Sequence, residues 1–363
     1  MDYTTNNVIN AFVNKSLVMG LILFWGISLA SCQTNMDNLS FKNRFEAVSE
    51  DNILRKPGYH NWGSSIIKGE DGKYHLFYSR WPEDHAAWLT FSEIAHATSE
   101  GPAGPWKYKE TVLEGRGKGH WDAITAHNPK IKYFNGKYYL YYIATNLGNM
   151  DYTDQDLIDT HGKSLDQSPV RKMLRENQRT GVAIASSLDG PWERLDQPII
   201  EPSGPITTLT VNPAIEQGKD GRFYLIVKGD KPHEKRFIRN QAVAISESPT
   251  GPFVMQPEPV IDYLDTEDMS MWYDKTRELF YGIFHAHEYL GLICSEDGVH
   301  WKKANEFEVL KKEIPMKNGQ VLHPDRMERP FIFLENGEAR TLCLAVLEGH
   351  ESYMVFVPIK AER

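Results

Sequence analysis

A repeated pair of strand patterns limits most strongly what this chain can fold into. In five places a polar or charged pair leads into a short apolar run, a turn with Asp, Asn or Gly, and then an aromatic-rich run. Four of the turns are Asp-Gly or Asn-Gly, which favour tight β-hairpins, and the other is a charged Asp-Lys turn. The five copies read SSIIKGEDGKYHLFYSRW, KIKYFNGKYYLYYIATN, AIEQGKDGRFYLIVKGD, SMWYDKTRELFYGIFHAH and FIFLENGEARTLCLAVLEG.

A second pattern follows each of the first four hairpins. It consists of a strand, a turn of small residues and an aromatic residue, as in ATSEGPAGPWKY, ASSLDGPWERL, AISESPTGPFVM and CSEDGVHWKK. Together the two patterns give four strands per unit, which is the logic of propeller repeats. Five such units account for residues 50 to 360. The sequence therefore predicts an all-β fold, a five-bladed β-propeller over residues 46–363.

One stretch interrupts the repeat. Residues 147–180 are rich in Asp, Lys, Arg and Gln, and they lie between the second and third predicted strands of blade two. We expect a loop or short helix at one mouth of the propeller. Insertions of this length in compact domains often carry function, although a solvated decoration is the alternative.

The first 32 residues have the pattern of an export signal. Lys15 precedes an apolar run, residues 17–30, that is too short for a typical membrane span. The run ends in Leu29-Ala30-Ser31-Cys32, which resembles the lipobox of bacterial lipoproteins. That resemblance implies an exported protein anchored through a lipid on Cys32, on the periplasmic face of the outer membrane or on the cell surface. Residues 33–45 would then be a tether, and an ordinary signal peptide is the alternative.

The net charge bears on which molecules the protein can bind, and the cysteines bear on whether it contains a disulfide. The formal net charge of -9 leaves no basic stripe to neutralise phosphates, so we expect no nucleic-acid partner. Cys294 and Cys343 could pair in an oxidising compartment, but each sits in an apolar run and is expected to be a buried free thiol. The expected partner is an oligosaccharide, with membrane contact only through the anchor, and the chain is expected to be a monomer.

The Asp-Gly-Pro-Trp turns and the NGKYYLYY hairpin carry a family resemblance. With five blades, the chain resembles the five-bladed propeller glycosidases, chiefly glycoside hydrolase family 43 and relatives such as family 117. The resemblance implies a base Asp, a second Asp that tunes it, and an acid Glu at the inner ends of blade strands. This chain has Asn61 and Trp62 at the first position and Asn128 near the second, and only Glu267 matches the acid. Two of the three positions therefore lack the carboxyl groups that an inverting hydrolase needs.

Near the strand ends where the resemblance implies carboxylates, this sequence has histidines, cationic residues and amides. A His can carry a proton near neutral pH, and Arg or Lys can neutralise a uronate carboxylate and stabilise the enolate that forms when the C5 proton leaves. That chemistry is β-elimination, by a lyase or by a dehydratase acting on a non-reducing-end uronate. The candidate catalytic residues are His127, His285, His287 and Glu267. The candidate substrate-binding residues are His60, Asn61, Arg80, Asp122, Asn128, Asn212, Lys228, Asp268 and Arg329.

Several of these residues have a structural alternative. His127 could bond neighbouring backbone, Arg329 could pair with Glu328, and Lys228 with Asp230. In a strand, His285 and His287 would face one side, so they form a possible half-site for Zn²⁺, and a Ca²⁺ ion is also possible.

Three functions follow from this set. The first is elimination on uronate-containing oligosaccharides, and a further resemblance to lipoproteins of marine Bacteroidetes that degrade ulvan implies an oligosaccharide dehydratase. The second is an exo-acting glycoside hydrolase, with Glu267 as acid and Asp122 or Asp268 as base. The third is a glycan-binding lipoprotein without catalysis.

Overall fold

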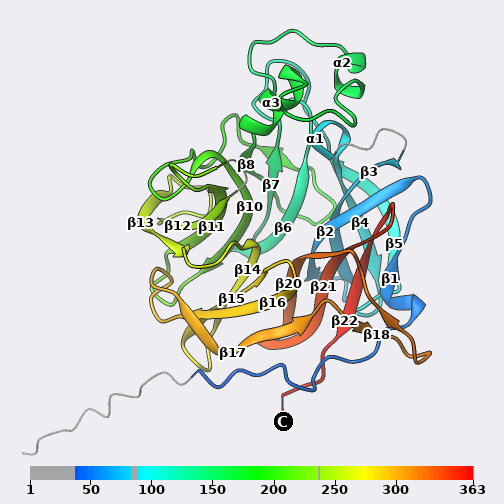
Figure 1. Ribbon diagram of the computed structural model, residues 1–363. Coiled ribbons are helices and arrows are strands. Elements are labelled where there is room, and N and C mark those ends of the chain that lie inside the picture. Colours follow the sequence, from blue (N-terminus) through cyan, green and yellow to red (C-terminus); the bar gives the residue numbers. More distant parts are fainter. Residues whose placement is uncertain (1–36, 84–87, 236–237, 363) are drawn as a thin grey trace, which may run out of the picture. The chain divides into compact units, whose positions relative to one another are not determined.

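Five four-stranded antiparallel sheets form the blades of a β-propeller (Figure 1). The computed structural model describes residues 37–83, 88–235 and 238–362. This confirms the predicted all-β, five-bladed architecture. The expected signal segment, including Cys32, lies outside the described residues.

The first four blades each use four consecutive strands. Blade one has β2 (Tyr59–Lys68), β3 (Tyr74–Pro82), β4 (Glu93–Ser99) and β5 (Lys107–Leu113). Blade two has β6 (His127–Phe134), β7 (Lys137–Ala144), β8 (Arg179–Ala185) and β9 (Glu193–Arg194). Blade three has β10 (Thr207–Gln217), β11 (Phe223–Asp230), β12 (Arg239–Ser246) and β13 (Val254–Ile261). Blade four has β14 (Glu267–Asp274), β15 (Leu279–His285), β16 (Tyr289–Ser295) and β17 (Lys302–Lys311).

The fifth blade closes the ring with a strand from the other end of the chain. Its sheet order is β20 (Arg326–Glu335), β21 (Glu338–Glu348), β22 (Glu351–Pro358) and then β1 (Ile53–Leu54). The second sequence pattern is missing after the fifth hairpin: β22 supplies the third strand of this blade, and β1 supplies the fourth by pairing Ile53 with Val355. Beside the blades lie a short ribbon, β18 (Ile314–Pro315) with β19 (Val321–Leu322), and a 3-10 turn, η1 (Glu50–Asn52).

The hairpin turns explain why these runs become blades. In Asn135-Gly136 and Asn336-Gly337 both turn residues have positive φ, between 50 and 83°. Asn and Gly tolerate this conformation best, and the resulting turn matches the right-handed twist of paired strands. The Asn-Gly signal in the sequence therefore fixes the register of these two hairpins.

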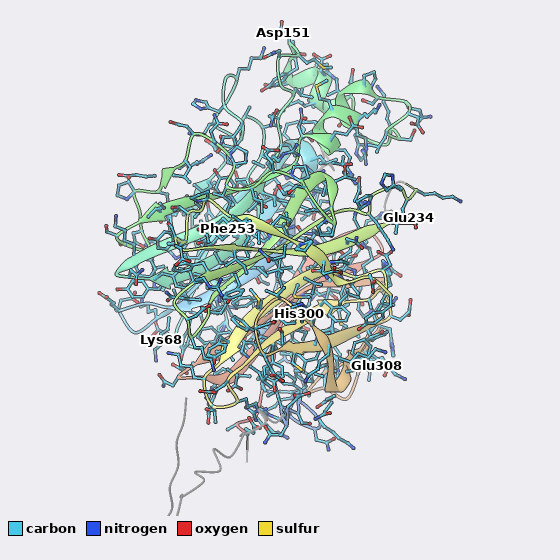
Figure 2. All side chains as sticks on the ribbon, turned by 90° about the vertical axis from the view of Figure 1, so that its left-hand side faces the viewer. Lys68, Asp151, Glu234, Phe253, His300 and Glu308 are labelled. Carbon is cyan, nitrogen blue, oxygen red and sulfur yellow. The ribbon has the colours of Figure 1, made fainter. Side chains whose placement is uncertain are left out.

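Residues 147–178 form the predicted insertion between β7 and β8. It contains α2 (Asp154–Ile158), which Thr153 caps, and α3 (Pro169–Glu176), which Ser168 caps. Leu147, Leu157 and Leu174 pack together as a small core of its own. The insertion lies at the end of the molecule near α1 (Trp88–Phe91), and Asp151 marks its tip in Figure 2.

The segment before the blades is packed where the sequence analysis expected a tether. Leu39 and Phe41 are buried in the core shared by blades four and five, and Phe45 bridges Ile359. Asp37 accepts a hydrogen bond from the Tyr281 hydroxyl at 2.8 Å. The expected boundary at residue 46 is therefore too late for the described residues 37–45, since their apolar side chains belong to the core.

The innermost strand of every blade breaks register at the same place. Each break contains one residue with positive φ, between 44 and 63°, that directly follows the residue facing the channel. Such bulges re-aim side chains in β-sheets. The five residues are Gly63, Asn128, Asn212, Asp268 and Arg329.

Gly63 leaves the space that two other members of this set fill. A Cβ at Gly63 would lie 2.5 Å from Oδ1 of Asn128 and 3.4 Å from Cγ of Arg329. We predict that Gly63→Ala lowers the free energy of unfolding by ~1–3 kcal/mol, because it combines overpacking with a strained φ. Denaturant unfolding measures this, and Gly58→Ala is the matched control, since Gly58 also has positive φ but has nothing within 4 Å of its Cβ position. Equal losses in the two variants would contradict the clash.

Candidate active site

A cavity of about 590 Å³ opens where the innermost strands begin. Aromatic, cationic and acidic side chains line it, from all five blades and from the insertion. The lining includes His60, Trp62, Trp81, Trp88, His127, Asp166, Arg171, Arg175, Asn212, Lys228, Arg239, Glu267, Arg326, Glu328 and Arg329. Clefts that combine aromatic walls with a few convergent charges are typical ligand sites.

Asp268 is buried next to three residues that line the cavity, Asn212, Lys228 and Arg329, and we call Asp268 with its polar neighbours the floor. Its carboxylate accepts a hydrogen bond from the Asn212 amide at 2.5 Å and an ion-paired contact from Arg329. Nδ1 of His285 lies 3.1 Å from its other oxygen, and Nζ of Lys228 lies 3.5 Å from Oδ1. Asn128 extends the network, since its amide lies 2.8 Å from Oδ1 of Asn212. The five positive-φ positions thus form a closed floor, because four of them carry polar side chains that reach one another.

The charges of this floor fix its protonation. Burial by itself raises the pKa of Asp268, but Arg329 and Lys228 outweigh it and hold that pKa well below its ordinary value. Burial lowers the pKa of His285, but the Asp268 and Glu328 carboxylates outweigh burial and the net shift is upward. Asp268 is therefore a carboxylate and His285 is biased toward the imidazolium form.

Glu267 directly precedes Asp268 in β14, and it lines the cavity. Its carboxylate contacts Nζ of Lys228, which extends from β11 of the neighbouring blade. Burial raises the pKa of Glu267, but the Lys228 ammonium outweighs it and the net shift is downward. Glu267 is therefore ionised near neutral pH, so it can accept a proton but has none to donate.

His127 is a neutral imidazole in the wall of the cavity. Its Nδ1 lies 2.7 Å from Oγ of Ser92, and its ring stacks on Trp88 at 4.7 Å between centroids. Complete burial and the nearby Arg329 guanidinium lower its pKa well below the usual range. The neutral imidazole is the form that can accept a proton, and its Nε2 lies 3.2 Å from the side-chain amide of Asn128.

The remaining wall has both aromatic and charged parts. His60 lies 3.0 Å from Oγ of Ser352 through Nδ1, and its ring packs against Trp81. Arg326 donates two hydrogen bonds of 2.6 Å to Oε1 of Glu328 and places its guanidinium 5.5 Å from the Trp62 ring centre. Flat aromatic faces beside charges suit a sugar ring that carries a charged group.

The insertion supplies cations that the sequence analysis missed. Arg171 and Arg175 come from α3, and Arg175 donates to Asp230 at 2.7 Å, where Arg239 also pairs. Their only signal in the sequence was the basic character of residues 147–180. Spacing along the chain could not place them at the cavity, because they reach it from a segment outside the repeat.

Four predicted site residues point elsewhere. Arg80 donates to Glu93 at 2.6 Å and to Tyr108 and Thr111, because its strand turns that side chain toward the outer strands of blade one. Asn61 is buried and donates to the Tyr59 carbonyl.

Asp122 is fully buried against β7 and β9 of blade two. It is held by Arg116 at 2.5 Å, Arg194 at 3.2 Å and the Tyr142 hydroxyl at 2.7 Å. This is an internal ion network, so Asp122 does not reach the cavity and cannot serve there as a base.

His287 diverges from His285. Strand β15 ends at His285 and a tight turn follows, so the alternation expected for a strand fails. The two rings are perpendicular, and His287 is 59% exposed and faces Asp265 at 3.5 Å. The expected His285–His287 half-site is therefore wrong.

Asp268, His285 and Glu328 are close enough to one another to be considered as a cation site. Lys228, Arg329 and Asn212 already contact the Asp268 carboxylate, and His285, which would have to be neutral to bind a metal, is biased toward the imidazolium form. A divalent ion would have to displace them against their charge, so this donor set does not fit a Ca²⁺ or Zn²⁺ ion.

Two further expectations concern disulfides and membrane-spanning helices. Cys294 and Cys343 are buried free thiols, as expected. Within residues 37–83, 88–235 and 238–362, no helix has the length and apolar character needed to cross a membrane.

Comparison with solved structures identifies relatives of the fold. Zg3597, a family 117 glycoside hydrolase produced by the marine bacterium Zobellia galactanivorans, superposes with a TM-score of 0.61 at 19% identity, covering 88% of this chain and 90% of that one. The chain has the fold of the propeller glycoside hydrolases. A thermostable family-43 glycoside hydrolase superposes at 0.56 and 13% identity, covering 84% and 94% of the two chains.

A third similar structure is CoXyl43, a family 43 β-xylosidase/α-arabinofuranosidase from a compost microbial metagenome. Its TM-score is 0.54 at 14% identity, with 88% and 98% of the chains covered. No protein-family model and no curated protein sequence matches the chain. At these identities the likeness establishes the fold, and the reaction has to be argued from the site.

Proposed function

We propose that this chain is a carbohydrate-active enzyme that binds the end of an anionic oligosaccharide in the cavity and acts on it by β-elimination. The observation that carries the proposal is the charge of the lining. Six cationic side chains line it, and carboxylates hold five of them in place: Asp230 pairs with Arg175 and Arg239, Glu267 with Lys228, Glu328 with Arg326, and Asp268 with Arg329. The cations are Arg171, Arg175, Lys228, Arg239, Arg326 and Arg329. Guanidinium and ammonium groups have several donors each, so a uronate carboxylate can accept further hydrogen bonds from this cluster of cations.

Elimination needs a base and a means of stabilising an enolate. His127, neutral and held by Ser92 at Nδ1, takes the C5 proton on Nε2 in place of the hydrogen bond from Asn128. Lys228 and Arg326 neutralise the sugar carboxylate while the electron pair of the C5–H bond spreads onto it. The C4–O bond then breaks, the C4=C5 double bond forms, and the leaving oxygen takes a proton from water. A 4-linked sugar leaves in a lyase reaction and water leaves in a dehydratase reaction, as expected for ulvan-type substrates.

Hydrolysis is the second candidate, and the structural comparisons favour it over elimination. Similar structures include family 43 and family 117 glycoside hydrolases. In this chain Glu267 would be the acid and Asp268 the base. The floor argues against those roles, because Lys228 and Arg329 keep both carboxyls ionised and an inverting hydrolase needs one of its pair protonated.

Product analysis separates the two. Elimination creates a double bond conjugated with the carboxylate, so near-ultraviolet absorbance rises, whereas hydrolysis adds water and leaves the absorbance flat. Uronate oligosaccharides, first from ulvan and then from pectin, incubated with residues 33–363 give the answer.

Arg326→Gln is predicted to weaken recognition of the carboxylate. We expect the KM for a uronate-ended oligosaccharide to rise roughly 10-fold, which corresponds to the loss of about one charged hydrogen bond. The KM for the same oligosaccharide as its methyl ester is expected to stay the same, because the ester lacks the charge. Arg340→Gln is the control, since Arg340 pairs with Glu338 at the start of β21 and does not line the cavity. Equal KM changes on acid and ester would contradict carboxylate recognition by Arg326.

We also propose that the protein is exported, anchored through a lipid on Cys32 and monomeric. The lipobox-like Leu29-Ala30-Ser31-Cys32 supports the anchor. Mass spectrometry of the mature N-terminal peptide tests it. A diacylated Cys32 is the expected result, and an unmodified N-terminus after Cys32 would contradict it.

A further inference from the structure

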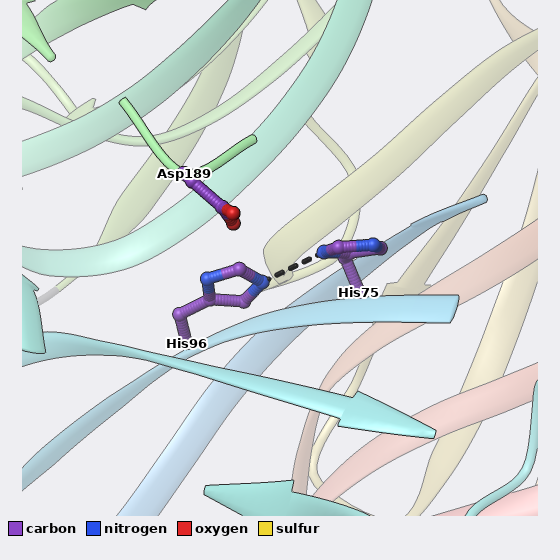
Figure 3. Close-up of side chains that lie close together, drawn as sticks. All are labelled: His75, His96 and Asp189. Atoms are coloured by element: carbon purple, nitrogen blue, oxygen red, sulfur yellow. Dashed lines mark hydrogen bonds between the residues drawn. The ribbon is translucent and has the colours of Figure 1, made fainter. Parts of the chain in front are cut away.

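A second group of metal-ligating side chains lies away from the cavity, between blades one and two. His75 is on β3, His96 is on the adjacent strand β4, and Asp189 is in the turn after β8 (Figure 3). One ligand atom from each lies within 4.8 Å of the other two. Nδ1 of His75 and Nε2 of His96 face each other at 2.8 Å.

The far side of each imidazole faces a carboxylate. Nε2 of His75 lies 3.1 Å from Oδ1 of Asp71, and Nδ1 of His96 lies 3.6 Å from Oε1 of Glu110. In metal sites the outer nitrogen of a ligating His is typically held in this way, which sets the tautomer and orients the ring. His75 has this hydrogen bond, whereas at 3.6 Å the Glu110 carboxylate is only a charged neighbour of His96, and the two inner nitrogens lie next to each other.

The surroundings hold these rings in place. His75 is 4% exposed and His96 is fully buried, and Phe77 stacks on His96 with centroids 4.6 Å apart. Asp189 is at the surface and is paired with Lys109, whose side chain is 38% exposed. An incoming ion can therefore replace the ammonium of Lys109, which has solvent to move into.

We propose that His75, His96 and Asp189 bind a zinc-type divalent ion. Two imidazole nitrogens and one carboxylate are ligands that Zn²⁺ prefers, and they leave a fourth position for water. With Zn–N bonds of about 2.0–2.1 Å in tetrahedral geometry, the two nitrogens would be about 3.3 Å apart. The rings therefore separate by roughly 0.5 Å on binding. Because the ligands come from two blades, the ion links blade one to blade two and stabilises the folded state.

Zinc titration tests this site directly. Chelator-treated protein is titrated with ZnCl2 by calorimetry, and the melting temperature is measured with and without zinc. We expect one bound ion and a higher Tm in wild type. We also expect affinity at least ~10-fold weaker in His96→Gln and Asp189→Asn. His300→Gln is the matched control, since His300 is exposed and paired with Asp297 at 2.7 Å.

Three results would overturn the proposal. Wild type could bind no zinc, which would leave His75 and His96 as a shared hydrogen bond only. Zinc binding could persist unchanged in both variants, or it could be lost in Glu328→Gln, which would place the ion at the cavity floor. Asp189 has a 59% exposed side chain, so Asp189→Asn is expected to fold and keeps the test decisive even if His96→Gln does not.

Discussion

Replacing His127 by Gln is expected to reduce kcat for uronate oligosaccharides by roughly 10²–10⁴-fold, the range that a positioned proton carrier contributes. The amide keeps a polar group next to Ser92 and Trp88 but cannot accept the C5 proton. Initial rates followed by near-ultraviolet absorbance measure the effect. Because the base is lost but the cations that bind the carboxylate remain, KM is expected to change much less than kcat.

The control for this variant is His300→Gln, which removes an exposed imidazole labelled in Figure 2. It is expected to leave kcat at the wild-type value. Circular dichroism has to show that His127→Gln is folded, since the residue is buried. A folded His127→Gln enzyme with wild-type kcat would contradict the role of His127 as the base and would leave Glu267 as the candidate proton acceptor.

Asp268→Ala is expected to lower the free energy of unfolding by about 3–5 kcal/mol, because it strands a buried charge network without its anion. Arg329, Lys228 and His285 all face that carboxylate. Urea unfolding followed by fluorescence measures the loss. Asp196→Ala is the control, since Asp196 is 90% exposed and its pairing with Arg116 is expected to contribute at most about 1 kcal/mol. An Asp268→Ala loss as small as that of Asp196→Ala would contradict the network.

The same network predicts a pH dependence of stability. The pKa of Asp268 is lowered by folding, so its contribution is present above about pH 5 and is lost as the pH falls below the unfolded value of about 3.9. The pKa of His285 is raised, so its contribution is present below about 6.5 and is lost as the pH rises through the folded value. Stability should therefore be greatest between about pH 5 and 6.5, and Asp268→Ala should flatten the acid side.

The fold could be predicted because its signals are local and repeated. Asn135-Gly136 and Asn336-Gly337 require the backbone conformation of a hairpin, and five copies of one hairpin leave few architectures. Closure by β1 could not be seen in the same way. Ile53 and Leu54 are too short a run to stand out, and their partner strand lies about 300 residues away along the chain, a separation that local patterns do not report.

The site was only partly predictable, for a geometric reason. Residues at the start of the innermost strands, His127, Glu267 and Arg329, reach the channel as expected because the repeat itself marks that position. Arg80 and Asp122 fail because a side chain's direction in or beside a strand depends on register, and a shift of one residue reverses the face.

The five equivalent positive-φ positions of the innermost strands could not be predicted from residue types either. Asn128, Asn212, Asp268 and Arg329 share one backbone conformation, yet their side chains differ in charge and size. Only the register breaks of the five innermost strands show that they are equivalent. The amide and charge network that closes the floor follows from that equivalence, and so does the need for glycine at position 63.

The measurement that tests the central claim most directly is simultaneous recording of near-ultraviolet absorbance and product mass while the protein acts on ulvan-derived uronate oligosaccharides. An absorbance rise with loss of one water, or a rise with chain cleavage, is the predicted result and would establish a dehydratase or a lyase. A flat trace with products that have gained water would contradict elimination and establish hydrolysis. Bound but unchanged oligosaccharide would contradict both and indicate a glycan-binding protein.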